Sequence, residues 1–278
     1  RSPTPHDMGS RLAITSSDSS LEQAWFALRA GGRQALIPYL TAGYPSPEAS
    51  VEALQAAAEV SDMLEVGVPF SDPLADGPTI QRSTFEALRQ GMTLPRTLDL
   101  IARADLSRPV IIFSYLNPIL RYGVERFLAD AAALHIAGLI LTDLPAGGDA
   151  GVESAVRQSQ LDLIRLIAPT TSPERLSRAV EGAQGFVYLV ARLGVTGATS
   201  TLSAGLDKLI GMVRRATPLP VAVGFGISTP EQARAVARMA DGVVVGSALV
   251  DVLGAGGVAE AGKFLLSLRR AIDAEDRS

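Results

Sequence analysis

The sequence predicts an α/β protein built as a single (β/α)₈ barrel, or TIM barrel, with one extra helix before the first strand. Eight short apolar runs alternate with helical patterns along the 278 residues; the runs span 35–41, 63–68, 110–115, 138–143, 163–168, 186–191, 221–226 and 242–247. Each run is apolar almost throughout, which is expected of parallel strands that are buried on both faces. The length also suits one barrel.

The segments between the runs contain recognisable helix starts. Hydroxyl side chains precede a proline and a glutamate at three places, 46–48, 171–174 and 228–231. This order caps the first helical N–H groups and fits the first turn. An amphipathic pattern at 20–30, ended by Gly31 and Gly32, predicts the extra helix. We therefore expect a disordered tail over residues 1–18, part of which reads as an expression-vector remnant, and one catalytic barrel domain over residues 19–278.

A doubly wound open sheet is the main rival arrangement. Such a sheet usually has fewer strands and carries a G-x-G-x-x-G fingerprint after its first strand. The turn that follows the first apolar run here, TAGYPSPE, lacks that fingerprint. Two small domains would also fit the length, but the unbroken alternation of strand and helix patterns favours one barrel.

Composition narrows the range of functions. The net charge is −4 and no long Lys/Arg run occurs, so we expect no nucleic-acid partner. The chain has no cysteine and only two histidines, which excludes thiolate metal sites and disfavours histidine-centred catalysis. Nothing in the sequence indicates a metal or an organic cofactor. No apolar run reaches the roughly 18 residues that span a bilayer. We therefore expect a cytoplasmic protein that has no membrane partner.

The most informative stretch is 63–81, MLEVGVPFSDPLADGPTIQ. An apolar strand carries Glu65, and a loop rich in proline and glycine then carries Asp72 and Asp76. A carboxylate inside an apolar run is costly unless it has a partner or a chemical task, and its burial would raise its pKa towards the range useful for acid–base catalysis. The two aspartates have an ordinary alternative, because Asp is common in turns and at helix starts.

In a barrel of this kind, the catalytic groups lie at the carboxyl ends of the strands and on the loops that follow them. The connection after the second run is the longest, with room for two helices at about 78–90 and 95–104. The connection after the sixth run opens with RLGVTGATSTLSAG, a small-residue stretch that could close over a pocket. The extra length at these two places indicates where the active site lies.

The last two apolar runs predict a phosphate site. They end in GFGIS and VGSAL, and a short helical segment follows the second, before Gly254. The loops after the last two strands of such barrels often bind phosphate through backbone N–H groups. The candidates are Gly226, Gly246 and Ser247, since a side chain at the glycines would hold the backbone away from the anion. The alternative is that these glycines only permit tight turns.

Taken together, LEVGVPFSDPLADGPTIQ, the GVTG at 194–197, GFGIS and VGSA resemble the tryptophan synthase α-subunit family, in order and spacing, from about 35 to 250. The resemblance implies a TIM-barrel lyase of L-tryptophan biosynthesis. The expected reaction is retro-aldol cleavage of indole-3-glycerol phosphate to indole and D-glyceraldehyde 3-phosphate. It also implies an αββα assembly with a pyridoxal-phosphate-dependent β subunit that receives the indole, while the α chain itself carries no cofactor.

The resemblance assigns roles to individual residues. Glu65 and Asp76 are the expected catalytic pair. The residues expected to line the substrate pocket are Tyr39, Phe113, Tyr115, Ile140, Thr142, Ile167, Tyr188, Thr196 and Phe225. The expected phosphate ligands are Gly197, Gly226, Gly246 and Ser247. The expected docking face for the β subunit includes Asp72, Pro73, Asn117, Pro118 and Pro145. For the apolar pocket residues the alternative is plain barrel packing, and for the prolines it is turn rigidity.

Other functions remain open at this point. A stand-alone indole-releasing lyase would have the same catalytic pair without depending on a partner. A catalytically silent barrel that only binds phosphate ligands would be expected to have lost Glu65 or Asp76, and both are present. The ring-closing synthase of the same pathway would need an active-site lysine, but Lys208 and Lys263 lie in helical segments away from strand ends.

Overall fold

The computed structural model describes residues 19–190, 199–224 and 226–274. Its eight strands form a closed barrel in which every neighbouring pair is parallel and β8 pairs with β1. The strands are β1 (Ala35–Thr41), β2 (Leu64–Gly67), β3 (Val110–Ser114), β4 (Ile136–Leu141), β5 (Asp162–Ile167), β6 (Val187–Val190), β7 (Val221–Gly224) and β8 (Gly242–Val245). The predicted eight-stranded barrel is therefore confirmed. The predicted tail over residues 1–18 lies outside the described residues.

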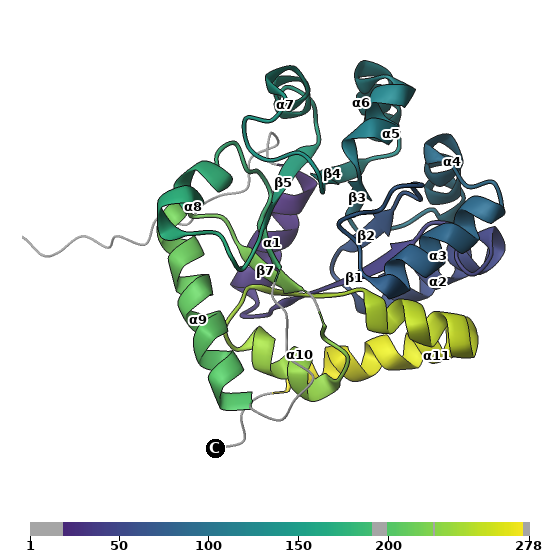
Figure 1. The fold of residues 1–278 in the computed structure, drawn as a ribbon. Coiled ribbons are helices and arrows are strands. Elements are labelled where there is room, and N and C mark those ends of the chain that lie inside the picture. Colours follow the sequence, from purple (N-terminus) through teal and green to yellow (C-terminus); the bar gives the residue numbers. More distant parts are fainter. Residues whose placement is uncertain (1–18, 191–198, 225, 275–278) are drawn as a thin grey trace, which may run out of the picture.

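Helices surround the barrel, as Figure 1 shows, with α11 lying beside α2 and α3. They are α1 (Ser20–Ala30), α2 (Pro47–Val60), α3 (Pro78–Arg89), α4 (Leu94–Ala104), α5 (Leu116–Tyr122), α6 (Val124–Ala133), α7 (Ala150–Arg157), α8 (Pro173–Ala179), α9 (Thr199–Ala216), α10 (Pro230–Ala237) and α11 (Ser247–Asp273). Two of the three expected caps form: the side chains of Ser46 and Thr229 accept N–H groups where a proline opens the helix. At the third start, Ser172 is the N-cap of α8 but its side chain makes no capping hydrogen bond.

The final helix differs from its prediction. A short helical segment was expected before Gly254, but α11 continues through that position to Asp273. Its interruption comes at Gly257, which has a φ of 74° and non-helical dihedral angles. Only glycine adopts that conformation without strain, so the helix breaks there. Gly254 stays helical, and a Cβ added to it would lie 2.1 Å from the Tyr44 hydroxyl oxygen.

Side chains alternate between the inside and the outside of the barrel, because successive strand residues point to opposite faces. Ile37, Ile111, Ile164 and Val244 belong to one buried cluster inside the barrel. The intervening strand residues pack against the surrounding helices in a second, larger cluster. This division matters for the site, because only inward-pointing residues near the carboxyl ends of the strands can reach a central pocket.

Helix α1 closes the other end of the barrel. Its residues Leu21, Trp25 and Leu28 are buried in the same cluster as the inward-pointing strand residues. The Trp25 ring meets Phe186 edge-on, with ring centroids 5.6 Å apart. Ser19 caps the helix in a capping box and also donates a 2.6 Å hydrogen bond to Asp162, the first residue of β5. The extra helix thus gives the barrel an apolar floor beneath the pocket.

A buried ion pair joins β5 to α7, and both of its side chains also bind the connection between β4 and α7. Arg165 and Glu153 are 3% and 4% exposed, respectively, and their side chains form a salt bridge. The guanidinium also donates to the Leu144 carbonyl oxygen at 3.3 Å, and the carboxylate accepts the Gly147 N–H at 2.8 Å. The loop that carries the predicted docking proline is therefore anchored to the barrel by charged groups with several partners each.

We predict that Glu153→Gln lowers the free energy of unfolding by about 3 to 5 kcal/mol, because it leaves Arg165 buried with its charge uncompensated. The double variant Glu153→Leu/Arg165→Met should cost less than either single change. Urea denaturation measures both. Arg157→Gln is the control: Arg157 contacts Glu153 at 3.7 Å but its side chain is 43% exposed, so it should cost less than about 1 kcal/mol. Equal losses in all variants would contradict the prediction.

Candidate active site

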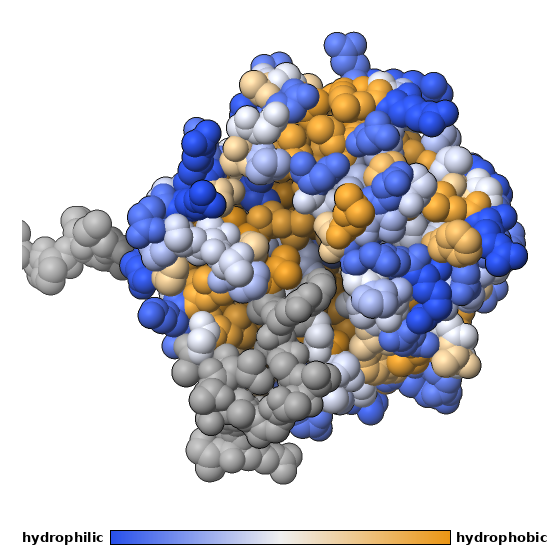
Figure 2. All heavy atoms as spheres, in the orientation of Figure 1, coloured by the Kyte–Doolittle hydropathy of each residue, from blue (hydrophilic) through white to orange (hydrophobic). Residues whose placement is uncertain are grey.

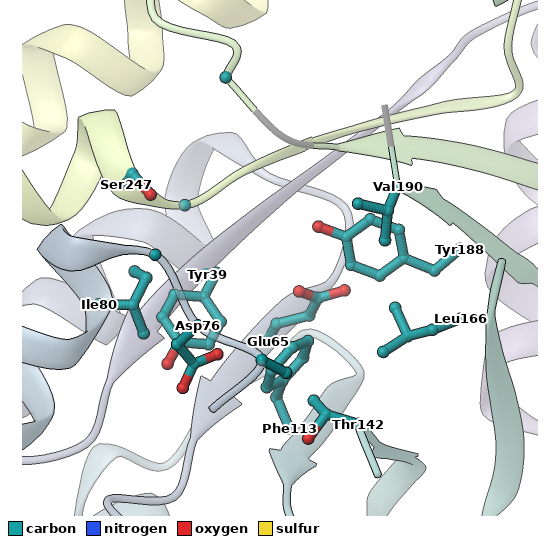
Figure 3. Close-up of a pocket in the computed structure, with 14 residues that line it drawn as sticks. Tyr39, Glu65, Asp76, Ile80, Phe113, Thr142, Leu166, Tyr188, Val190 and Ser247 are labelled. Carbon is teal, nitrogen blue, oxygen red and sulfur yellow. The ribbon is translucent and has the colours of Figure 1, made fainter. Parts of the chain in front are cut away.

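A pocket of about 160 Å³ opens at the carboxyl ends of the strands. Figure 3 shows its side chains converging from the strands and from the loop before α3. The lining residues are Tyr39, Glu65, Ala75, Asp76, Gly77, Ile80, Phe113, Thr142, Leu166, Tyr188, Val190, Gly226, Gly246 and Ser247. Most of these residues are apolar or glycine, and two are carboxylates. The pocket therefore suits a largely apolar ligand that meets acidic groups at defined points.

Glu65 is 1% exposed and lies on β2, level with Tyr39 of β1 and one layer above the apolar floor. Neither carboxylate oxygen has a hydrogen-bond partner among the residues that the structure describes. Burial raises the pKa of Glu65 to about 8, since an ionised carboxylate is disfavoured where water is excluded. A carboxylic acid that changes protonation state near neutral pH is suited to pass protons to and from a ligand.

Tyr39 and Tyr188 lie on either side of Glu65 (Figure 3). Each ring packs against a glycine of the next strand. A Cβ on Gly67 would lie 2.0 Å from the Tyr39 hydroxyl oxygen, and one on Gly224 would lie 2.4 Å from that of Tyr188. Only glycine leaves room for these rings. Burial raises the pKa of both tyrosines, so both keep their protons and can act as hydrogen-bond donors. The rings form opposite walls around the carboxylate.

Asp76 lies in the loop between β2 and α3, and Tyr115 supports it. The Tyr115 hydroxyl accepts the Ala75 N–H at 2.9 Å, which leaves its own proton free to donate to the Asp76 carboxylate. Burial raises the pKa of Asp76 to about 6, and the hydrogen bond from Tyr115 limits this rise. The Asp76 backbone is held as well, because its N–H donates to Pro73 and its carbonyl oxygen accepts from Gln81. Asp76 is therefore ionised at neutral pH.

The predicted phosphate residues that the structure describes line the pocket just after β7 and β8. Gly246 and Ser247 start α11, and no side chain caps the N-terminus of this helix. Gly226, which has a φ of 82°, lines the pocket after β7. Uncapped N–H groups at a helix start, together with the helix dipole, favour an anion. Thr196, Gly197 and Phe225, which were also predicted to bind the ligand, lie outside the described residues.

Three predicted pocket residues do not line the pocket. Ile167 points away from the barrel axis and packs in the outer cluster, because it alternates with Leu166, which does line the pocket. Ile140 points inward but lies one layer too deep, below Thr142. Tyr115 stands behind the loop and contacts Ala75 and Asp76 rather than the cavity.

Five lining residues were not predicted: Ala75, Gly77, Ile80, Leu166 and Val190. The first three belong to the same LADGPTIQ segment as Asp76, so the segment itself was the available signal. The other two could have been found by strand alternation, because Leu166 and Val190 share the inward face with Ile164 and Tyr188. Thr142, a predicted pocket residue, does line the pocket, and its hydroxyl interacts with that of Tyr115.

The predicted docking residues lie on loops and on α5 at this same end of the barrel. Asp72, Asn117 and Pro145 are exposed, whereas Pro73 and Pro118 are partly covered. Large exposed apolar side chains accompany them: Leu74 is 92% exposed and Leu120 is 47% exposed. In Figure 2, apolar residues gather between α7 and the α5–α6 pair. An exposed apolar surface beside a pocket is a common feature of protein interfaces.

The described residues contain no helix that is both long and apolar enough to cross a membrane. They also contain no cluster of three or more His, Cys, Asp or Glu side chains that could hold a metal ion. The pocket itself presents two carboxylates, the side chains of Tyr39 and Tyr188, and the hydroxyl groups of Thr142 and Ser247.

The chain was compared with known proteins. The sequence profile described as tryptophan synthase alpha chain matches residues 26–267. The tryptophan synthase alpha chain of Chloroflexus aggregans is 46% identical over 84% of this chain and 89% of its own length. That of Acidiphilium cryptum is 47% identical over 86% and 88%.

Solved structures agree with this. The crystal structure of tryptophan synthase from M. tuberculosis in its aminoacrylate-bound form contains a chain that is 39% identical, with a TM-score of 0.83 and coverage of 92% of this chain and 100% of that one. Tryptophan synthase subunit alpha from Legionella pneumophila is 35% identical, with a TM-score of 0.84 and coverage of 92% and 99%. Sequence, barrel and carboxylate pocket lead to the same assignment, and the chain belongs to the tryptophan synthase alpha chain family.

Proposed function

We propose that this chain cleaves indole-3-glycerol phosphate to indole and D-glyceraldehyde 3-phosphate by a retro-aldol reaction. The observation that carries the proposal is the buried Glu65, whose carboxylate has no hydrogen-bond partner in the described part of the chain and shares one pocket with Asp76. The reaction needs a proton at indole C3, support for the ring nitrogen as it becomes electron-poor, and removal of the proton from the glycerol hydroxyl next to the breaking bond. Two carboxylates in different environments can divide these tasks.

Glu65 is assigned the proton transfers. Its protonated form donates to indole C3, and the resulting carboxylate takes the proton from the hydroxyl on the adjacent glycerol carbon. The electrons of that O–H bond form the aldehyde, the carbon–carbon bond breaks, and indole recovers its aromatic ring. A pKa of about 8 suits both steps, because it lies close to working pH. Each such transfer is typically worth about 10² to 10⁴ in rate.

Asp76 is assigned an electrostatic task. In its ionised form it accepts the indole N–H and so stabilises the positive charge that appears on the ring after C3 is protonated. The hydrogen bond from Tyr115 helps to keep Asp76 ionised, because it lowers the pKa of the carboxyl. The phosphate of the substrate is assigned to the wall made by Gly226, Gly246 and Ser247, where the start of α11 is uncapped.

We further propose that the chain acts with a tryptophan synthase β subunit in an αββα assembly in the cytoplasm. In this assembly the pyridoxal phosphate belongs to the β subunit, and the α chain needs neither metal nor cofactor for the cleavage. The exposed Leu74 and Leu120, together with the predicted docking residues, supply an apolar surface for such a partner. The intact carboxylate pair disfavours a catalytically silent barrel. A stand-alone lyase is distinguished only by its rate without the partner.

Activity measurements on variants of Glu65 and Asp76 test the proposed reaction. Purified chain should release indole from indole-3-glycerol phosphate slowly alone and faster with a β subunit. Glu65→Gln should lower kcat by at least about 10²-fold, because glutamine cannot carry the proton. Asp76→Asn should do the same, because it removes the charge opposite the ring nitrogen. Full activity without a partner would favour the stand-alone lyase, and no release under either condition would refute the proposed reaction.

The pH dependence of kcat/KM tests the protonation states assigned to Glu65 and Asp76. The profile should be bell-shaped: it rises near pH 6 as Asp76 ionises and falls near pH 8 as Glu65 loses its proton. Tyr115→Phe should move the acidic limb to higher pH, because the carboxylate loses a donor that lowers its pKa. Ionisation of the substrate phosphate cannot produce that shift. Tyr122→Phe, far from the pocket, should retain the wild-type profile. An acidic limb that stays in place in Tyr115→Phe would contradict the assignment.

The pH dependence of the free energy of unfolding tests whether Glu65 is buried. Because folding raises the pKa of Glu65, the acid form contributes stability that is fully present below pH 4.5 and is lost as pH rises through 8. At 1.4 kcal/mol per pKa unit the upper limit is about 5 kcal/mol. Wild type should therefore lose stability relative to Glu65→Gln between pH 5 and pH 9, as followed by urea denaturation. Parallel stability curves would show that Glu65 is not desolvated.

A further inference from the structure

A polar cluster joins α3 to α11 directly behind the pocket. The Arg82 side chain donates to the Asp251 carboxylate at 2.5 Å, and the Thr79 hydroxyl donates to the same carboxylate at 3.1 Å. Arg82 also interacts with the Tyr44 hydroxyl, which in turn lies against the backbone of Gly254 on α11. Three separate segments of the chain therefore meet at one carboxylate and one guanidinium.

The cluster lies one helical turn from both functional walls of the pocket. Asp251 follows Ser247 by four residues on α11, so the two share a face of the helix. Thr79 follows Asp76 by three residues, and its neighbour Ile80 lines the pocket. In Figure 1, α3 and α11 lie side by side, and the two helices are in contact. The link thus ties the loop that carries one carboxylate to the helix start that faces the anion.

The loop before α3 is held locally, because Gln81 donates to the carbonyl oxygens of Pro73 and Asp76, but these bonds do not reach α11. The N-cap of each helix is a glycine, Gly77 for α3 and Gly246 for α11, and neither helix has a side-chain cap. Glycine leaves the backbone free to move, so the separation of the two helix starts depends on contacts made further along. Asp251 also places a negative charge one turn from the wall assigned to the phosphate, and Arg82 compensates that charge.

We propose that Arg82 and Asp251 are positioning residues, which fix the spacing between Asp76 and the phosphate wall and so hold the substrate in register with the carboxylates. The inference rests on the proposed function. A substrate anchored at its phosphate presents its indole ring to Asp76 only if that spacing is constant. Misplacement of a catalytic group by about 1 Å can cost up to 10²-fold in rate, whereas an exposed ion pair contributes little to stability.

The test compares Arg82→Gln and Asp251→Asn with wild type, using kcat and KM for indole-3-glycerol phosphate and the midpoint of thermal unfolding. Each variant should lower kcat about three- to tenfold with an unchanged midpoint. Arg82→Gln should also raise KM, because the Asp251 carboxylate then has no positive partner and repels the substrate phosphate. The swapped double variant Arg82→Asp/Asp251→Arg should recover most of the lost kcat.

Glu260→Gln is the matched control. Glu260 also lies on α11 and pairs with Lys263, and its side chain is 51% exposed, as is that of Asp251. It should leave kcat unchanged. Single variants with wild-type kcat would overturn the proposal, and so would a loss of kcat that the swap does not recover. If the two single variants shift KM in opposite directions at constant kcat, the pair acts only through its charges on phosphate binding, and the proposal is overturned. Absence of turnover by wild type would refute the proposed function itself, whereas turnover with unaffected variants refutes only the link.

Discussion

The burial of an unpaired carboxylate, Glu65, is the constraint on which the arrangement of the pocket depends. An isolated ionised carboxylate is very costly inside a protein, so the group takes up a proton instead and its pKa rises to about 8. The pKa rises this far only if water is excluded from the carboxylate both by the layer of side chains beneath it and by the side chains on either side of it. The inward-pointing isoleucines and α1 provide the first condition, and the rings of Tyr39 and Tyr188 provide the second.

The two carboxylates differ because their surroundings differ. Glu65 lies on a strand within the barrel and accepts no hydrogen bond from any described residue, whereas Asp76 lies on a loop at the barrel mouth and accepts a hydrogen bond from the Tyr115 hydroxyl. One therefore holds a proton near neutral pH and the other holds a charge. This separation of protonation states allows two residues of the same chemical class to take the acid–base task and the electrostatic task in one reaction.

Substrate geometry then becomes a matter of spacing between secondary-structure elements. Glu65 is fixed by the barrel, but Asp76 and the uncapped start of α11 belong to segments that leave it. The Arg82–Asp251 link lies on the outer side of those segments, where it can set their separation without entering the pocket. Half-exposed polar groups at a contact between two helices can therefore position substrate-binding segments, even though they add little to the stability of the fold.

The sequence by itself determined the eight-stranded barrel, the extra helix and the stretch that carries Glu65 and Asp76, because apolar runs, helix starts and a carboxylate inside an apolar strand are local signals. It also placed Gly246 and Ser247 at the last strand end. Only the tertiary structure decided that Leu166 rather than Ile167 faces the pocket, that Ile140 lies beneath it and that Tyr115 supports Asp76 from behind. These outcomes depend on strand register and on how far along its strand each residue lies, which closure of the barrel sets through contacts between residues distant in the chain.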